Sequence, residues 1–228
     1  MKTNLGLTMR LVQRSFACIV VAMIASPVVA QTPAPAPAPR PGDVDLANSR
    51  VYILVSATGL GHPHGVEGRL ASGNLQLGAA QNAGQLVIDM KSFAAETPAA
   101  RKYVGLAGES DDSTRRQVTD NMLGPEVLDV ARFPQSTFAI QSASRYVNSQ
   151  QQGGPPLYIL DGQFTLHGVA KHLRLLAQGD EVNGMIHVHG RFDFLQSQFG
   201  ITPFTKLLGT VGVADKLYVY GDLWVYAR

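Results

Sequence analysis

The sequence predicts an all-β protein, an antiparallel sandwich or barrel, with a short helical insertion near residues 97–123. Two observations carry this prediction. Short segments rich in β-branched and aromatic residues recur after residue 50, and apolar and polar side chains alternate in them, as they do on strands with one buried face. Glycine and proline separate these segments, most clearly in Gly153-Gly154-Pro155-Pro156, where they interrupt regular structure.

Residues 1–30 have the features of a cleaved signal peptide and are left out of the fold. Lys2, Arg10 and Arg14 form a positively charged start, and the apolar segment 16–24 that follows is too short to span a bilayer comfortably. Small residues ending at Ala30 suit cleavage at that point. We therefore expect a periplasmic or secreted protein.

The composition of the mature chain excludes several classes of function. The only cysteine, Cys18, lies in the leader, so disulfides, thiol catalysis and cysteine-ligated metal centres are excluded. Three of the 19 basic residues also lie there, which leaves 16 basic against 17 acidic residues and a net charge of −1. The mature chain has no basic stripe, so we expect no nucleic-acid partner.

Residues 31–48 predict a linker, because a tract of alternating proline and alanine favours an extended polyproline II conformation and buries nothing. Residues 49–228 then form one domain of ordinary length. The segments of this domain with strand character are 50–57, 65–77 (one or two strands), 84–90, 136–144, 157–168, 172–178, 185–194 and 216–228.

Two neighbouring segments have helical character. Residues 97–105 have good helix composition with Gly105 at the end, and residues 111–123 begin with acidic and serine residues and stop before Gly124-Pro125. Both lie between strand segments, so we expect them to form an insertion over one end of the β structure, where they could serve as a lid.

Two strand segments present an apolar face that we predict to be internal. In the segment MIHVHGRFDF (185–194), apolar residues occupy one parity and His187, His189 and the charged residues the other. The segment 157–168 alternates in the same way. Each apolar face either lines a ligand tunnel or packs as ordinary core, and we predict the tunnel, with lining residues Tyr158, Leu160, Phe164, Leu166, Ile186, Val188, Phe192 and Phe194.

Two His-x-His pairs offer an alternative function. His62 and His64, and likewise His187 and His189, have the spacing at which two imidazoles on a strand face the same way and can chelate zinc or copper. A catalytic zinc normally needs a third protein ligand, and the sequence does not show that the pairs meet. We expect the imidazoles to lie outside the barrel. A metal-dependent enzyme or metal carrier that uses these histidines is therefore our second hypothesis, after a ligand held in the tunnel.

The last strand segment is apolar or amphipathic on both faces. Tyr218, Tyr220, Trp224 and Tyr226 share one parity. This face suits a homodimer contact or a transient contact with a membrane. The simpler interpretation, which we favour, is closure of the β structure by a well-packed terminal strand.

The order of three further landmarks resembles the YceI-like family of secreted bacterial proteins. They are LDVARFPQSTF (128–138), GQFTLHGVAKHL (162–173) and QFGI (198–201), and the resemblance runs from about residue 50 to residue 228. His172 stands where this family usually has proline, and Gln196 where an arginine is common.

The resemblance implies an antiparallel, lipocalin-like β-barrel of about eight strands that holds a long isoprenoid lipid, such as a prenyl quinone, in its interior. It also implies no catalysis and no cofactor other than this ligand. The sequence agrees, because it contains no Gly-x-Ser-x-Gly element or paired catalytic carboxylates. We therefore expect a non-catalytic periplasmic carrier or reservoir.

Overall fold

The fold is that of a computed structural model, which describes residues 38–147 and 154–227. The signal peptide expected at 1–30 and the start of the linker lie outside the described residues. Within the described ranges the strands are β1 (Arg50–Gly59), β2 (His64–Leu75), β3 (Gly84–Ala95), β4 (Gln135–Tyr146), β5 (Leu157–Leu166), β6 (Val169–Val182), β7 (Met185–Leu195), β8 (Thr205–Lys206) and β9 (Val211–Tyr226).

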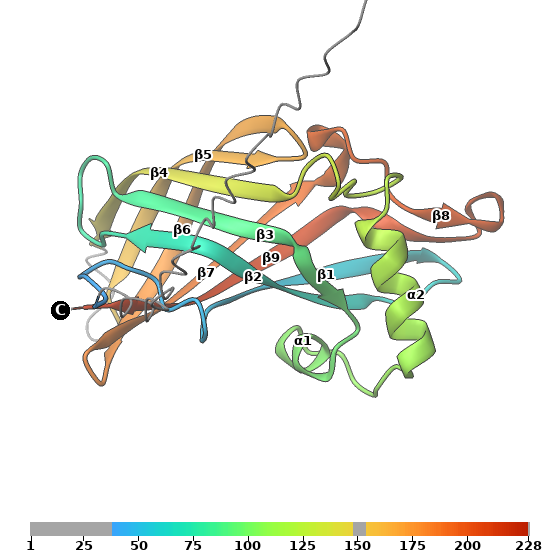
Figure 1. Cartoon of the computed structure of the whole chain (residues 1–228), viewed down its shortest axis with the longest axis horizontal. Helices are drawn as coiled ribbons and strands as arrows, with labels where there is room; N and C mark the ends of the chain where they lie inside the picture. The colour runs from blue at the N-terminus through green and yellow to red at the C-terminus, as the bar shows by residue number, and fades with distance from the viewer. Residues whose placement is uncertain (1–37, 148–153, 228) are drawn as a thin grey trace, which may run out of the picture. The chain divides into compact units, whose positions relative to one another are not determined.

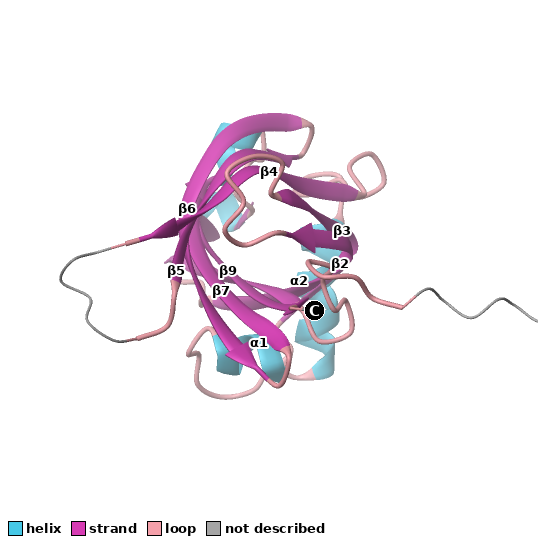
Figure 2. Ribbon diagram, turned by 90° about the vertical axis from the view of Figure 1, so that its left-hand side faces the viewer, coloured by secondary structure: helices cyan, strands magenta, loops and turns pink. Residues whose placement is uncertain are grey.

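The strands form a closed antiparallel barrel. Each strand from β1 to β6 pairs with the next, β7 pairs with β9, and β9 returns to pair with β1. Eight strands of the described chain therefore close the barrel, and β8 is a short addition to β9. Figure 2 looks along this barrel from one end. The predicted all-β barrel of about eight strands is confirmed.

The barrel unit begins before residue 49, the predicted start of the domain. Val44 is buried in the core and bridges Val225, while Asp43 bridges Asn74. The backbone N–H of Gly42 also donates to the carbonyl of Tyr226. These contacts join the incoming chain to the last strand, so the final residues of the expected linker belong to the folded unit.

Two short helices follow β3, as expected. Helix α1 (Pro98–Tyr103) is capped by Thr97, and helix α2 (Asp112–Leu123) by Asp111, whose carboxylate accepts the N–H of Thr114. Among the described residues, no helix is long and apolar enough to cross a membrane. Helix α2 lies across one end of the barrel, which we call the helix end (Figure 1).

The three landmark segments of the sequence converge at the helix end. The β5–β6 turn consists of His167 and Gly168, both with positive φ, as a tight two-residue hairpin turn requires. The Phe133 ring packs against His167 with the ring centres 4.2 Å apart. A side chain at Gly168 would collide with this ring. Phe199 and Ile201, from the third landmark, are buried in the adjoining core.

Three features of the described chain were not predicted: strand β8, η1 (Gln196–Phe199) and η2 (Leu207–Gly209). They connect β7 to β9. Each is at most four residues long, which is too short for a strand or helix periodicity to be visible in sequence.

Candidate functional site

The interior of the barrel encloses an apolar cavity of about 230 Å³. All eight barrel strands contribute to its lining, together with helix α2 and η1. The lining consists mostly of Val, Leu, Ile, Met and Phe side chains. An engineered cavity of about 150 Å³ with similar walls stays dry and binds benzene. The barrel therefore has room for a larger hydrocarbon group.

Six of the eight residues predicted for the lumen line this cavity. They are Leu160, Phe164, Leu166, Val188, Phe192 and Phe194. Alternation on β5 and β7 therefore correctly identifies the inward face.

Tyr158 and Ile186 require a correction, because neither lines the cavity. Both pack against the core as partly buried side chains. Both also approach Gly179 on β6, where an added Cβ would lie 3.2 Å from the Tyr158 ring and 3.3 Å from an Ile186 methyl. They lie on the part of β5 and β7 far from the helix end, where they pack against the core and do not reach the cavity.

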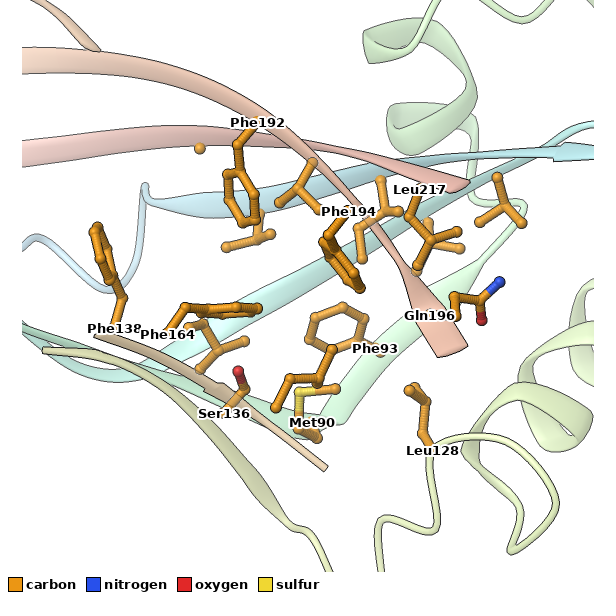
Figure 3. Close-up of a pocket in the computed structure, with 18 of the residues that line it drawn as sticks. Met90, Phe93, Leu128, Ser136, Phe138, Phe164, Phe192, Phe194, Gln196 and Leu217 are labelled. Atoms are coloured by element: carbon orange, nitrogen blue, oxygen red, sulfur yellow. The ribbon is translucent and has the colours of Figure 1, made fainter. Parts of the chain in front are cut away.

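Four aromatic side chains form a cluster inside the barrel that extends to the helix end. The rings of Phe164 and Phe192 have centres 5.5 Å apart, and those of Phe194 and Phe199 5.0 Å apart, both edge to face. Figure 3 shows Phe164, Phe192 and Phe194 directed into the interior from opposite walls. Phe199 was not predicted, because it lies outside the strand segments.

The polar side chains of the described lining are confined to the helix end. They are His64 at the start of β2, Asn121 on α2, Ser136 near the start of β4 and Gln196 in η1. The Ser136 hydroxyl donates to the Thr165 carbonyl at 2.7 Å, and the Gln196 amide donates to the Ala214 carbonyl at 2.8 Å. The cavity is thus polar at one end and apolar over the rest of its length.

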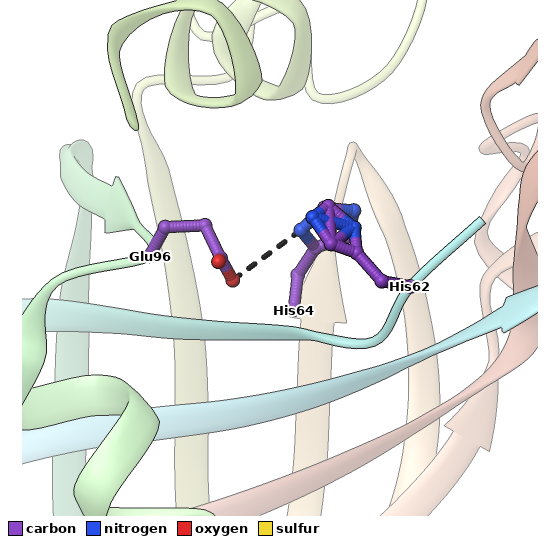
Figure 4. A group of neighbouring side chains, drawn as sticks. All are labelled: His62, His64 and Glu96. Carbon is purple, nitrogen blue, oxygen red and sulfur yellow. Dashed lines mark ion pairs between the residues drawn. The ribbon is translucent and has the colours of Figure 1, made fainter. Parts of the chain in front are cut away.

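A buried carboxylate lies beside His64 (Figure 4). Glu96 is fully buried and accepts hydrogen bonds from the Gly65 N–H at 3.1 Å, from Arg101 Nη1 at 2.6 Å and from the Ser110 hydroxyl. Burial raises the pKa of Glu96, but the His64 imidazole, the Ser110 hydroxyl and the Gly65 amide outweigh it and lower this pKa to about 2.

The position of His64 corrects the expectation that the imidazoles lie outside the barrel. Its side chain lines the cavity, and its Nδ1 atom lies 3.3 Å from Glu96 Oε1. The contact lacks hydrogen-bonding geometry, so this buried nitrogen has no hydrogen-bond partner among the described residues. His62 lies beside it with the ring centres 4.5 Å apart and is exposed.

His187 and His189 lie on the outer face of β7, as expected. Asp222 of β9 joins them: His187 Nε2 is 2.5 Å from Asp222 Oδ1, and His187 Nδ1 is 3.1 Å from His189 Nε2. Within the described chain, each His-x-His pair therefore has its own carboxylate, Glu96 or Asp222. Neither acid could be predicted from the sequence. The register of β9 on β7 places Asp222 beside His187 and His189, and the connection between β3 and α1 places Glu96 beside His64.

The aromatic face of β9 points outward, while Leu217, Val219 and Leu223 line the cavity. Tyr103 of α1 stacks on Tyr52 of β1 with the ring centres 3.8 Å apart, and it meets Tyr220 edge to face at 6.1 Å. Helix α1 therefore covers part of the aromatic face of β9, the surface that would suit a homodimer contact.

The fold and the cavity define a class of protein: a closed antiparallel β-barrel with an apolar interior of ligand size. The chain belongs to the YceI-like domain family, which matches residues 43–223. The family expectation is thereby confirmed. No curated protein matches the chain.

Two solved structures share the fold. BcnA of Burkholderia cenocepacia is 18% identical, with 80% of this chain and 99% of that chain covered and a TM-score of 0.51. A polyisoprenoid binding domain from Saccharophagus degradans, implicated in plant cell wall breakdown, is 14% identical, with 83% and 100% covered and a TM-score of 0.50. At these identities the likeness supports the fold alone.

Proposed function

We propose that this protein is a periplasmic or secreted, non-catalytic carrier or reservoir that holds an isoprenoid chain, a polyprenyl lipid or prenyl quinone, in its barrel. The apolar cavity is the observation that carries the proposal. Membership of the YceI-like family and the likeness to a polyisoprenoid binding domain support it. The polyprenyl chain has no charges to pair, so a wall of aliphatic and aromatic side chains suffices to bind it.

The energetics favour such a ligand. Burial of apolar groups contributes about 0.8 kcal/mol per CH₂, so about ten buried carbons contribute roughly 8 kcal/mol before the cost of ordering the chain. The lining phenylalanines Phe164, Phe192 and Phe194 add flat apolar surface against which methyl branches can pack.

The distribution of polar groups orients the proposed ligand. His64, Asn121 and Gln196 lie at the helix end of the cavity. A polar head group, such as a quinone with its carbonyl oxygens, gains hydrogen bonds only there. The isoprenoid tail then runs from the helix end into the apolar part of the barrel.

Mass spectrometry of an organic extract tests the proposal directly. Protein purified from its native compartment should release a prenyl lipid, and protein stripped of lipid should take up a prenyl quinone. Protein that is consistently empty and also fails to take up prenyl quinones would contradict the proposal.

A cavity-filling substitution at Gly221 separates lipid binding from folding. Gly221 lines the cavity, and an added Cβ would have the Gly190 carbonyl oxygen, 3.9 Å away, as its nearest neighbour. The Cβ of a Gly221→Leu side chain therefore meets no backbone atom, and its remaining carbons should extend into the lumen. We expect it to raise the Tm of the lipid-free protein, because it buries about three to four carbons at ~0.8 kcal/mol each, and to reduce prenyl quinone uptake at least about tenfold.

The matched control is Gly221→Ala, which adds one methyl group and should retain most of the uptake. Equal uptake by the leucine variant and the parent, with both folded, would mean that the ligand does not occupy this part of the lumen.

A further inference from the structure

We propose that His187, His189 and Asp222 form a binding site for one divalent transition-metal ion of the zinc and copper class on the outer wall of the barrel. The three residues lie on the paired strands β7 and β9, with His189 directly opposite Asp222. One nitrogen or carboxylate oxygen from each residue lies within 4.8 Å of the others, and in the proposed site the two imidazoles bind the ion while Asp222 orients His187. This site is separate from the lumen, so it does not depend on the proposed lipid function.

The separation of the two imidazoles suits a single ion. His187 Nδ1 and His189 Nε2 are 3.1 Å apart. Two nitrogens at 2.0–2.1 Å from a tetrahedral zinc are about 3.3 Å apart. An ion placed beside the line that joins these two nitrogens can reach both of them, once the rings turn to direct their lone pairs at it and the proton between them is lost.

Asp222 and Trp224 hold His187 in the orientation that this binding requires. Asp222 Oδ1 lies 2.5 Å from His187 Nε2, the nitrogen not used by the ion. A carboxylate that accepts the second N–H of a metal-bound histidine fixes its tautomer and raises its basicity. Trp224 stacks on the same ring at 4.0 Å with an interplanar angle of 10°.

The charges around the pair favour a cation. Asp180 of β6 lies directly opposite His187 on the other side, so carboxylates flank the pair on both neighbouring strands. Arg50, opposite Asp222 on β1, directs its guanidinium to the backbone carbonyls of Ala47 and Ser49. The His187 and Asp222 side chains are 21% and 19% exposed, so water can complete the coordination.

The other His-x-His pair is the weaker candidate. The carboxylate beside it, Glu96, is already bound to Arg101, Ser110 and the Gly65 amide. A metal ion there would lie next to a guanidinium whose charge opposes binding. Glu96 therefore stabilises the local fold, whereas Asp222 accepts no hydrogen bond from a basic side chain other than His187 in the described chain.

Fluorescence reports on this site selectively, because Trp224 is the only tryptophan of the protein. Titration of the metal-free protein with Cu²⁺ should quench this fluorescence until one equivalent is bound, and Zn²⁺ should compete with the quenching. The His187→Ala/His189→Ala variant should lose the saturable quenching, with an affinity loss of more than about 100-fold. Asp222→Ala should weaken binding about 10–100-fold, as the loss of an orienting carboxylate does.

The matched controls are His172→Ala and His62→Ala/His64→Ala. His172 forms an exposed pair with Asp161 at 3.0 Å but has no second imidazole nearby, and both controls should quench like the parent. The proposal is overturned if the parent shows no saturable quenching, if the His187→Ala/His189→Ala variant binds like the parent, or if the His62→Ala/His64→Ala variant loses binding. All variants should take up prenyl quinone as the parent does, except those that change His64.

Discussion

Glu96 illustrates how one residue joins the helical insertion to the barrel. It follows the last residue of β3 and adopts a positive φ of 63°, which is unusual for a residue with a side chain. Its buried carboxylate ties the start of β2 to Arg101 of α1 and to Ser110, close to the start of α2. A buried charge is stable only with such partners, so this carboxylate holds the helical segment in place.

The pKa of Glu96 predicts how acid destabilises the protein. Since this pKa is lowered in the folded protein from 4.5 to about 2, the ionised carboxylate stabilises the fold above pH 4.5, and this contribution is lost as the pH falls from 4.5 to about 2. The difference corresponds to about 3 kcal/mol. Glu96→Gln should therefore lower the free energy of unfolding at pH 7 by about 3 kcal/mol, and by much less near pH 2.

Denaturant unfolding of parent and variant at several pH values measures this difference. Glu126→Gln, an exposed position in the same β3–β4 connection, should unfold like the parent throughout. A constant gap between the Glu96→Gln variant and the parent from pH 7 to pH 2 would show that the carboxylate's charge contributes nothing.

At the scale of the element, helix α2 is the part of the described chain best suited to move. It contains no fully buried residue, whereas the neighbouring strands are paired on both sides. Its contribution to the cavity lining consists of Val118, Asn121 and Met122. A ligand in the lumen therefore adds apolar contacts to Val118 and Met122, as the lid hypothesis requires.

We expect ligand binding to stabilise α2 more than the barrel wall. In hydrogen exchange, the amides of Asp112–Leu123 should exchange faster than those of β7 in the lipid-free protein and should slow when a prenyl quinone is bound. Asp111→Ala, which removes the N-cap, should speed exchange in α2 without changing β7. Identical exchange in α2 with and without ligand would argue against a role as a lid.

At the scale of the whole molecule, exposed leucines gather at the end of the barrel where the polar lining lies. Leu60, Leu207 and Leu208 are 87%, 75% and 106% exposed. The Leu60 N–H donates to the Thr210 carbonyl, which brings the two loops together. Leu207 and Leu208 both have positive φ, which is costly for leucine and points to a functional constraint. We propose this tip, in place of the aromatic face of β9, as the surface for a transient membrane contact.

The tip should therefore speed the transfer of a prenyl quinone from vesicles to the protein. Insertion of a leucine side chain into an apolar phase contributes about 1.5–3 kcal/mol. Leu207→Ser/Leu208→Ser should slow transfer from phospholipid vesicles at least about tenfold. Quinone affinity in detergent should remain unchanged. Leu176→Ser, on the outer wall of β6 and 46% exposed, is the matched control, and equal slowing by this variant would contradict a specific tip.

The sequence by itself determined the class of the fold and most of the inward face. The period of two on β5 and β7 identified six lining residues, and caps and turn residues identified the helices, because these signals arise between residues close together in the chain. The three landmark segments identified the YceI-like family, which the match over residues 43–223 confirms.

Only the tertiary structure decided which side chains from different strands lie next to one another. The register of β9 on β7 brings Asp222 to His187 and His189, and the turn after β3 buries Glu96 beside His64. Alternation also does not reveal that Tyr158 and Ile186 lie beyond the cavity, since a filled and a hollow stretch of barrel have the same period. Such facts depend on strand register and on the volume that opposing side chains leave, and both are set by contacts between residues distant in the chain.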